Sequence, residues 1–450
     1  MRDLVLLAFI GAIAVLGLKR PFLWVLLSAY VDIIAPQKLG FSFLADLPNV
    51  SLVVAALAIG GWLIADAGKG FSVSGRQLLM LLLLAYAAIT TINADMPVDA
   101  QEKWDWAWKA VFFAIFLPFA LRTKLRIEAY LLTMLLCAAA LIISGGLKTV
   151  LSGGGYGSLV LLVQENSGLY EGSTISTIAI AMVPLVLWFA RHGTIFPTDW
   201  RVRAFCYALA FACLLIPIGT QTRTGLLCIG ALFALMLRDS KRRFLYLGAA
   251  GFLALAAVPF LPQSYTSRMT TIQDYQADQS AGTRLAVWGW TLDYVKGRPF
   301  GGGFEAYRQN RIMVSTVTEQ GSGSLQSISS STVQDGGRAW HSAYFEMLGE
   351  QGFPGLALWL LIHAIGLIRM ERLRRRYRKD EERPWIAPLA TALQHFQLVY
   401  LVGALFVAVA FQPFVWMILG VQVAFDRWVS AQEKATRAPG FTFQPAAAGA

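Results

Sequence analysis

The sequence predicts an all-α integral membrane protein, a polytopic bundle of about 12 transmembrane helices with one large polar loop. Hydrophobic residues make up 56% of the chain and charged residues only 14%, a balance foreign to soluble domains. Apolar runs of about 16–20 residues recur throughout, each long enough to cross the hydrocarbon core. They lack the alternation of transmembrane strands, so a helical bundle is the structure that satisfies its backbone in lipid.

The candidate spans divide the chain into four regions. Residues 1–260 hold the N-terminal transmembrane helices, residues 261–342 the large loop, residues 343–430 the C-terminal helices, and residues 431–450 a small-residue tail that we expect to be disordered. Within the loop, residues 314–337 are rich in Ser, Gly, Thr and Gln, which favours mobility. The spans are expected at residues 3–18, 21–35, 50–66, 77–93, 107–121, 128–146, 172–190, 204–219, 224–237, 244–260, 343–368, 387–411 and 413–427.

Two boundaries need separate reasoning. The first span looks superficially like a signal peptide, but Lys19 and Arg20 follow it without a small-residue cleavage site, so we expect it to be retained. The last two spans are interrupted at Gln412 and Pro413. The acidic segment 95–105 and residues 145–171 are expected to be connections, on the same face as the large loop.

The formal net charge of +11 is explained by topology. Basic residues concentrate in short turns, at 67–76, 122–127, 191–203, 238–243 and 369–385, as the positive-inside rule predicts for cytoplasmic loops. This distribution argues against nucleic acid as a partner and favours membrane lipids. The four cysteines lie in apolar spans without any CxxC pair, which argues against a disulfide framework or a cysteine-based metal site.

Three polar constellations are candidates for chemistry. The first is the tight turn that carries Arg223, because an arginine at membrane depth usually faces a polar cavity or an anion. The alternative is an arginine that extends to the interface. The second is Arg284, which the spacing of Leu285, Trp288 and Leu292 places in the first turn of an amphipathic helix. There it would form an anion pocket with free backbone N–H groups, or a surface ion pair with Asp278 or Glu305.

The third constellation is His341, at or just before a helix start where the loop re-enters the membrane. A neutral imidazole is the commonest general base, and the nearby arginines favour that role over a simple backbone hydrogen bond. His363 and His395 lie within spans, where helix–helix hydrogen bonding is expected. No His or carboxylate pair has metal-ligand spacing, and residues 301–303 lack the Lys-Ser/Thr of a phosphate loop. We therefore expect no metal and no cofactor.

These three constellations, in this order, resemble the O-antigen ligase and O-antigen polymerase superfamily. Arg223 matches a short Ser/Thr-Arg-x-Gly motif, residues 282–304 resemble a Gly-Arg-x-x-x-Trp … Pro-x-x-Gly-x-Gly signature, and residues 341–355 resemble His-Asn-x-x-Leu … Gly-x-x-Gly. Ser342 stands where the family often has Asn, and Thr283 separates Gly282 from Arg284. Residues 1–92 look like the ligase-type subgroup found beside exosortase systems.

The resemblance implies a GT-C-like glycosyltransferase of the bacterial inner membrane with its active site on the periplasmic side. The donor would be a glycan on undecaprenyl pyrophosphate and the acceptor a hydroxyl of lipid A-core. His341 and Arg284 are then the catalytic candidates, and the substrate-binding candidates are Arg223, Arg298, Arg338 and Tyr344. We expect a monomer. An O-antigen polymerase, a protein O-oligosaccharyltransferase and a transporter of lipid-linked sugar remain the alternatives.

Overall fold

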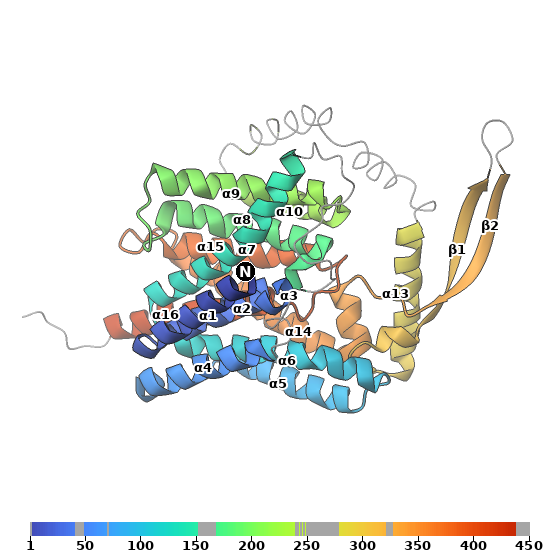
Figure 1. Ribbon diagram of the computed structural model, residues 1–450, viewed down its shortest axis with the longest axis horizontal. Coiled ribbons are helices and arrows are strands. Elements are labelled where there is room, and N and C mark those ends of the chain that lie inside the picture. The colour runs from blue at the N-terminus through green and yellow to red at the C-terminus, as the bar shows by residue number, and fades with distance from the viewer. Residues whose placement is uncertain are drawn as a thin grey trace, which may run out of the picture.

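The computed structural model describes residues 2–40, 49–69, 72–151, 168–238, 279–320 and 327–437, together with 243, 245 and 248. Seven helices of this described part are long and apolar enough to cross a membrane. The chain is therefore an all-α polytopic membrane protein, as predicted (Figure 1). These helices are α5 (Gly75–Ile92), α7 (Lys124–Leu151), α8 (Gly172–His192), α9 (Trp200–Gly219), α14 (Ala343–Arg376), α15 (Ile386–Gly403) and α16 (Pro413–Arg437).

Five further helices of the described chain pack with them, namely α1 (Arg2–Lys19), α2 (Phe22–Ile34), α4 (Val50–Ala65), α6 (Pro97–Ala120) and α10 (Arg223–Leu237). A short helix, α3 (Pro36–Leu39), follows α2. Most of the predicted span at 244–260, the loop residues 261–278, residues 152–167 and the tail from residue 438 lie outside the described residues.

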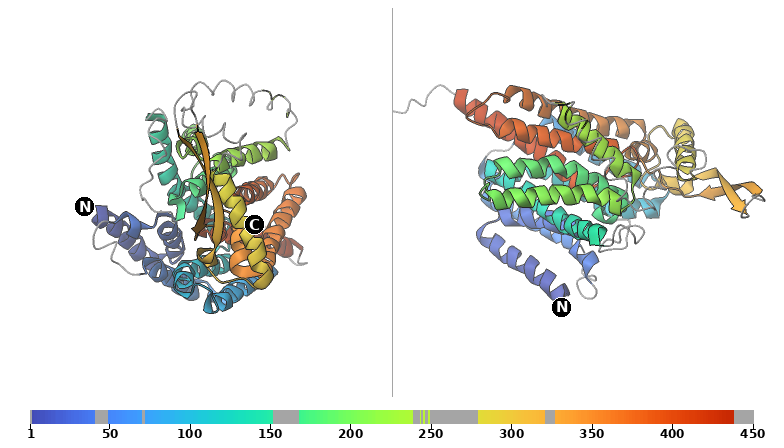
Figure 2. Two further views of the ribbon diagram at one scale, coloured as in Figure 1. Left: turned by 90° about the vertical axis from the view of Figure 1, so that its right-hand side faces the viewer. Right: turned by 90° about the horizontal axis from the view of Figure 1, so that it is seen from above.

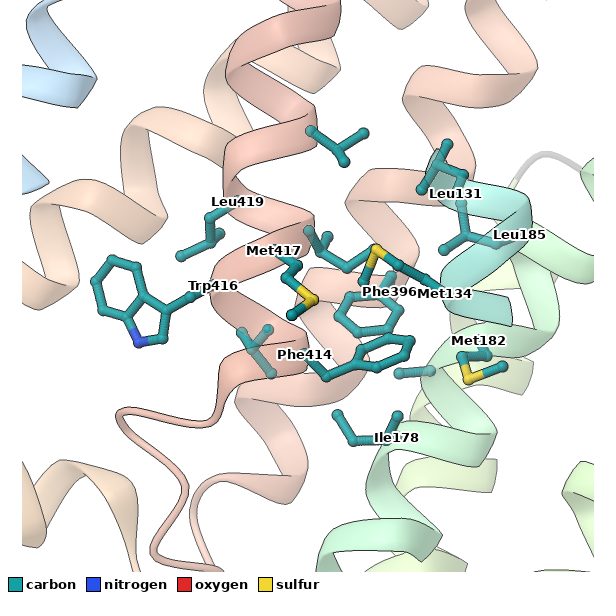
Figure 3. Close-up of a cluster of buried hydrophobic side chains, with 14 of the residues drawn as sticks. Leu131, Met134, Ile178, Met182, Leu185, Phe396, Phe414, Trp416, Met417 and Leu419 are labelled. Carbon is teal, nitrogen blue, oxygen red and sulfur yellow. The ribbon is translucent and has the colours of Figure 1, made fainter. Parts of the chain in front are cut away.

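The centre of the bundle is a cluster of large apolar side chains at the meeting of four helices (Figure 3). Helix α8 is buried over most of its length and packs against α9, α15 and α10. Because lipid tails are as apolar as these side chains, burial gives little hydrophobic driving force in the bilayer, and tight packing becomes a main source of helix association. The cluster includes Leu131 and Met134 of α7, Ile178, Met182 and Leu185 of α8, Phe396 of α15, and Phe414, Trp416, Met417 and Leu419 of α16.

Two boundaries differ from the sequence-based expectation. The acidic segment 95–105 is mostly helical, because α6 begins at Pro97 and has Asp99 in its first turn. Proline at the first helical position and a carboxylate near the N-terminal dipole both favour helix initiation there. Helix α7 continues to Leu151, beyond the predicted end of its span. The interruption before Pro413 is confirmed, since α16 starts there, but it is longer than expected, because α15 ends at Gly403 and the predicted span continued to residue 411.

The basic turns gather at one end of the bundle. Arg126 forms an ion pair with Asp66 at 2.6 Å, the backbone N–H of Thr194 donates to Glu128 at 3.0 Å, and Lys124 lies 4.6 Å from the ring centre of Trp385. These contacts join four turns that are far apart in the sequence. The grouping predicted from the charge pattern is therefore present in three dimensions.

The large loop forms the opposite end. It contains helix α13 (Gln279–Gly297), a 3₁₀ turn η4 (Ala306–Gln309) and an antiparallel pair, β1 (Arg311–Gln320) with β2 (Ser327–Gly336), in which Val314 lies opposite Val333. The pair extends away from the bundle (Figures 1 and 2). Composition favoured mobility for residues 314–337, yet most of this segment is strand, because Val, Ile and Thr recur among its serines and favour extended backbone.

Candidate active site

Helix α13 is held against the start of α14 by two tryptophans. The indole N–H of Trp288 donates to the carbonyl of Trp340 at 2.8 Å, and the indole of Trp340 donates to the hydroxyl of Thr291 at 2.8 Å. The ring of Trp288 also stacks on Phe345, with centroids 4.8 Å apart and planes 5° from parallel. Arg284 precedes Trp288 by four residues and therefore lies on the same face of α13. His341 follows Trp340 in the sequence, and this docking places Arg284 near enough to act on it electrostatically.

His341 lies just before α14, as predicted, with Ser342 as the N-cap residue. Its backbone is left-handed, with φ of 47°. A non-glycine residue in this conformation is uncommon and persists where the surroundings over-determine it. Here the Trp288–Trp340 hydrogen bond holds one side, and the N–H of Ala343 donates to the carbonyl of Ala404 at 2.8 Å on the other.

The surroundings lower the pKa of His341 from its ordinary value of 6.5. Desolvation of the charged imidazolium is the largest cause, and the positive charges of Arg284 and Arg338 act in the same direction, while Glu171 opposes them. Although protein atoms crowd the ring, His341 remains exposed at the surface of the protein. The imidazole is consequently neutral at pH 7 and accessible, as a general base requires.

Glu171 is a participant that the sequence analysis did not single out. It is the N-cap residue of α8, where its carboxylate accepts from the backbone N–H groups of Ser173 at 2.9 Å and Thr174 at 2.5 Å. A carboxylate directly before Gly-Ser-Thr and an apolar run is a recognisable N-cap pattern. Its electrostatic effect on His341 shows that the start of α8 faces the His341 segment.

The Arg223 turn packs on the same end of α8. Three hydroxyl groups hold the turn there by hydrogen bonds. The hydroxyl oxygens of Ser176 and Thr220 are 2.7 Å apart, and the hydroxyl of Thr222 donates to that of Ser176 at 2.9 Å. Gln221, at the apex, has φ of 53°. A Cβ on Gly225 would lie 2.5 Å from the ring of Pro217, so glycine allows α10 to start close against α9. Arg223, half-buried as the first residue of α10, is thereby fixed near the Glu171 end of α8.

One expectation for Arg284 is wrong. Helix α13 begins at Gln279, so Arg284 is its sixth residue and lies beyond the first turn. The N–H groups that lack helical acceptors belong to the residues before it. Of its two proposed ion-pair partners, Glu305 bonds to Arg308 at 3.1 Å and Asp278 lies outside the described residues.

Two family models match this chain. Residues 208–360 match the O-antigen ligase family, and residues 1–194 match a family of unknown function. The first match contains the Arg223 turn, all of α13 and the His341 segment. Residues 208–360 are an O-antigen ligase domain. This is the domain of the ligase- and polymerase-type glycosyltransferases of the membrane. No curated protein matches the chain.

Within the O-antigen ligase domain, the glycine-rich run clamps the loop onto α14. The N–H groups of Gly302 and Gly303 donate to the carbonyls of Gly349 at 3.0 Å and Glu350 at 2.9 Å, and Phe353 donates to Pro299 at 3.0 Å. Gly352, with φ of 63°, bends α14 at this contact. The contact is backbone against backbone, because a Cβ on Gly301 would lie only 2.3 Å from the Glu350 carbonyl oxygen. These glycines therefore allow the loop to pack closely against α14, and they do not form a phosphate-binding loop.

A buried cation and three carboxylates lie beneath this clamp. Lys103 Nζ is 2.7 Å from Glu346, 2.6 Å from Glu350 and 3.8 Å from Glu305. The backbone N–H of Ala410 donates to Glu346 at 3.0 Å, and that of Glu305 donates to Glu350 at 3.0 Å. The cluster joins α6, α14, the loop and the α15–α16 connection. Two glutamates one turn apart in an apolar span predict such a partner, but not which cation supplies it.

The remaining candidates already have protein partners. Arg298 pairs with Asp95 at 2.7 Å, Arg338 pairs with Asp335 at 2.5 Å, and the hydroxyl of Tyr344 donates to the carbonyl of Leu401 at 3.0 Å. The side chains of Arg298 and Arg338 are still more than half exposed, so both can also meet a ligand. His363 bonds to Gln397 of α15 at 2.9 Å, the helix–helix contact expected for it.

Proposed function

We propose that this chain is an O-antigen ligase-type enzyme that transfers a glycan from undecaprenyl pyrophosphate to a hydroxyl of lipid A-core. The reaction takes place at the periplasmic face of the bacterial inner membrane. The observation that carries the proposal is that Arg284 lies on the face of α13 that Trp288 anchors at the start of α14, and that its charge helps to lower the pKa of His341. A cation for the leaving group thus lies beside a base for the nucleophile.

The chemistry is a single displacement with inversion. The acceptor oxygen forms a bond to the anomeric carbon of the donor while the bond from that carbon to the pyrophosphate oxygen breaks. His341 takes the proton of the acceptor hydroxyl, and undecaprenyl pyrophosphate leaves with the electron pair. Removal of such a positioned base typically costs about two to four decades in rate.

The arginines stabilise the departing diphosphate. Arg284 and Arg223 each present a planar fork of N–H donors suited to phosphate oxygens, and the charge that they neutralise grows as the anomeric bond breaks. Pyrophosphate is already a good leaving group, so the proposed mechanism is metal-independent and needs no general acid. Arg298, Arg338 and Tyr344 are proposed to contact the glycans.

The acceptor is tested by a panel of substrates. The purified protein and a lipid-linked glycan are incubated with lipid A-core, with a second lipid-linked glycan, or with a candidate acceptor protein. Transfer to lipid A-core supports the ligase. Product with either of the other acceptors alone would identify a polymerase or a protein O-oligosaccharyltransferase. Product in detergent, where no gradient exists, separates all three enzymes from a transporter.

His341→Ala is expected to abolish detectable transfer, a loss of about two to four decades, while the protein still inserts and melts cooperatively. The measurement is product formation by purified protein with saturating donor. His192→Ala is the matched control, because His192 lies at the C-terminal end of α8, where the basic turns gather. Near-normal transfer by His341→Ala would refute the role as base.

Arg284→Lys is expected to lose activity nearly as severely as Arg284→Ala, because an ammonium is a point charge and cannot engage two diphosphate oxygens in a plane. Steady-state rates across a range of donor concentrations measure this. Arg311→Lys, in β1 of the same loop, serves as the control. Full activity of Arg284→Lys would mean that positive charge alone suffices at this position.

A further inference from the structure

A second cavity lies at the end of the bundle where the basic turns gather, away from the Arg284–His341 pair. Its volume is about 840 Å³, which is within the usual range for small-molecule sites. The walls come from the last turns of α8, α10 and α14 and from the first turns of α15. Nothing in the proposed transfer reaction uses it.

The cavity has a cationic rim. Arg191, Arg378 and Lys379 line it, and no described carboxylate forms an ion pair with any of them. Arg374 also lines it but is held by Glu371 at 2.8 Å. Of the two carboxylates in the lining, Asp380 is engaged by Arg383 at 2.9 Å, which leaves Glu381 to oppose three cations. The rim therefore attracts an anion.

Most of the wall residues below this rim are apolar. Leu187 and Pro184 precede Arg191 on α8 by four and seven residues, so the deeper one lies about 10 Å along the helix from the charge. Leu235 and Met236 of α10 face the same space, and Met236 is 46% exposed. On α15, Ala387 and Pro388 continue the apolar lining, and Thr391 and His395 add two polar side chains to it. Charge at the mouth and hydrocarbon beneath it are arranged in the order found in a phospholipid.

We propose that this cavity binds an anionic glycerophospholipid. The phosphate lies between Arg191, Arg378 and Lys379, and an acyl chain lies along Leu187 of α8 and Met236 of α10. A diffuse attraction to acidic membranes would need only positive charge anywhere on this end. The cavity instead places three cations, none paired with a carboxylate of the described chain, above one largely apolar channel, which suits a single headgroup with its own chain.

The proposal is tested by thermal unfolding of the detergent-purified protein during titration with phosphatidylglycerol, with phosphatidylcholine and with glycerol 3-phosphate. The pocket variant combines Arg191→Gln, Arg378→Gln and Lys379→Gln. The control variant combines Arg201→Gln, Arg203→Gln and Arg372→Gln, which removes the same charge from exposed positions outside the cavity. The midpoint of unfolding is followed as a function of ligand concentration.

Phosphatidylglycerol is expected to raise the unfolding temperature of the wild-type protein and of the control variant at similar concentrations. The pocket variant should need a phosphatidylglycerol concentration about a hundredfold higher for the same rise in unfolding temperature, since each juxtamembrane cation is worth about 1 kcal/mol. The single variants Arg378→Gln and Lys379→Gln should each need a phosphatidylglycerol concentration about fivefold higher. Both side chains are exposed, so we expect these single variants to fold even if the triple variant does not.

Three outcomes would overturn the proposal. An equal loss in pocket and control variants would mean attraction by net charge. Equal stabilisation by glycerol 3-phosphate would identify a site for a free phosphate ester without the acyl chain. Equal stabilisation by phosphatidylcholine would show that the anionic charge is not recognised.

Discussion

His341 combines two properties that oppose each other in most proteins. Its ring is crowded enough by protein atoms for desolvation to lower its pKa, yet the residue is still exposed at the surface of the protein. Desolvation and two arginines keep the imidazole neutral, while Glu171 limits the shift. At residue scale, the pKa of His341 is therefore set by opposing charges from the start of α8, from α13 and from the segment that follows β2.

The pH dependence of transfer should follow this balance. The rate requires neutral His341, so it falls as pH drops through a pKa that lies below 6.5. Glu171→Gln removes the charge that raises this pKa, and the acidic limb of kcat/KM should move to lower pH. Arg338→Gln removes a charge that lowers it, and the limb should move to higher pH. Limbs that stay fixed in both variants would place the titrating group elsewhere.

The buried Lys103 cluster shows a different use of charge. A carboxylate left without its cation in such a place typically costs about 3–5 kcal/mol, because burial has removed the water that would otherwise solvate it. Lys103, Glu346 and Glu350 are all buried, and each glutamate also accepts a backbone N–H. The cluster therefore acts at residue scale to specify how α6, α14 and the loop fit together.

At the scale of elements, the site depends on the docking of α13 and of residues 299–303 onto the first half of α14. The Arg-x-x-x-Trp spacing has a direct physical meaning, since Trp288 anchors the helix face on which Arg284 lies. The glycine-rich run at residues 301–303 also has a direct physical meaning. It brings two backbones into contact at residues 349–352, where a Cβ on Gly301 or on Gly352 would lie 2.3 Å from a carbonyl oxygen of the facing segment.

Gly301→Ala should therefore loosen the loop. The new Cβ would meet the Glu350 carbonyl oxygen at 2.3 Å, and φ of 87° is unfavourable for alanine. We expect a loss of about 1–3 kcal/mol in local stability, measured as faster hydrogen exchange in residues 298–305, together with reduced transfer.

Gly289→Ala is the matched control for this change. Gly289 lies in α13 of the same loop with nothing within 4 Å of its Cβ position, so alanine there should be neutral or slightly stabilising. Unchanged exchange in Gly301→Ala would show that the clamp tolerates a side chain.

At the scale of the whole molecule, the two ends of the bundle have different chemistry. One end gathers the basic turns and the 840 Å³ cavity, and the other carries the loop with Arg284 and His341. Positive turns stay on the cytoplasmic side during insertion, so the loop end is expected to face the periplasm. This orientation would place the transfer site on the side where the proposed acceptor is found.

Cysteine labelling tests the orientation. The four native cysteines are all buried, which keeps the background low. A cysteine in place of Lys296 in α13 should react with a membrane-impermeant maleimide in cells whose outer membrane alone is permeabilised. One in place of Glu382, at the basic end, should react only after lysis. The opposite pattern would reverse the orientation and remove the periplasmic proposal.

The sequence alone was sufficient for features that depend on local composition. Apolar length determined most helices, the distribution of arginine and lysine determined which turns share an end, and the break at Pro413 and the position of His341 before α14 followed from local patterns. The start of α13 was misjudged, because Asp278, Ser280 and Thr283 can each cap a helix and the sequence alone does not choose among them. The extent of α6 was missed because a charged helix start resembles a loop.

Only the tertiary structure decided which groups meet. Lys103 lies 247 positions from Glu350, and Glu171 reaches His341 from a different helix, so neither pairing has any local sequence pattern. The glycines at 301–303 gained their role only when the backbone they touch, at 349–352, was known. Hydropathy and charge spacing are properties of residues that are neighbours in the sequence, and they determine the spans. The pKa of a side chain, ion pairing and close backbone contact depend instead on distances in space, which only folding creates.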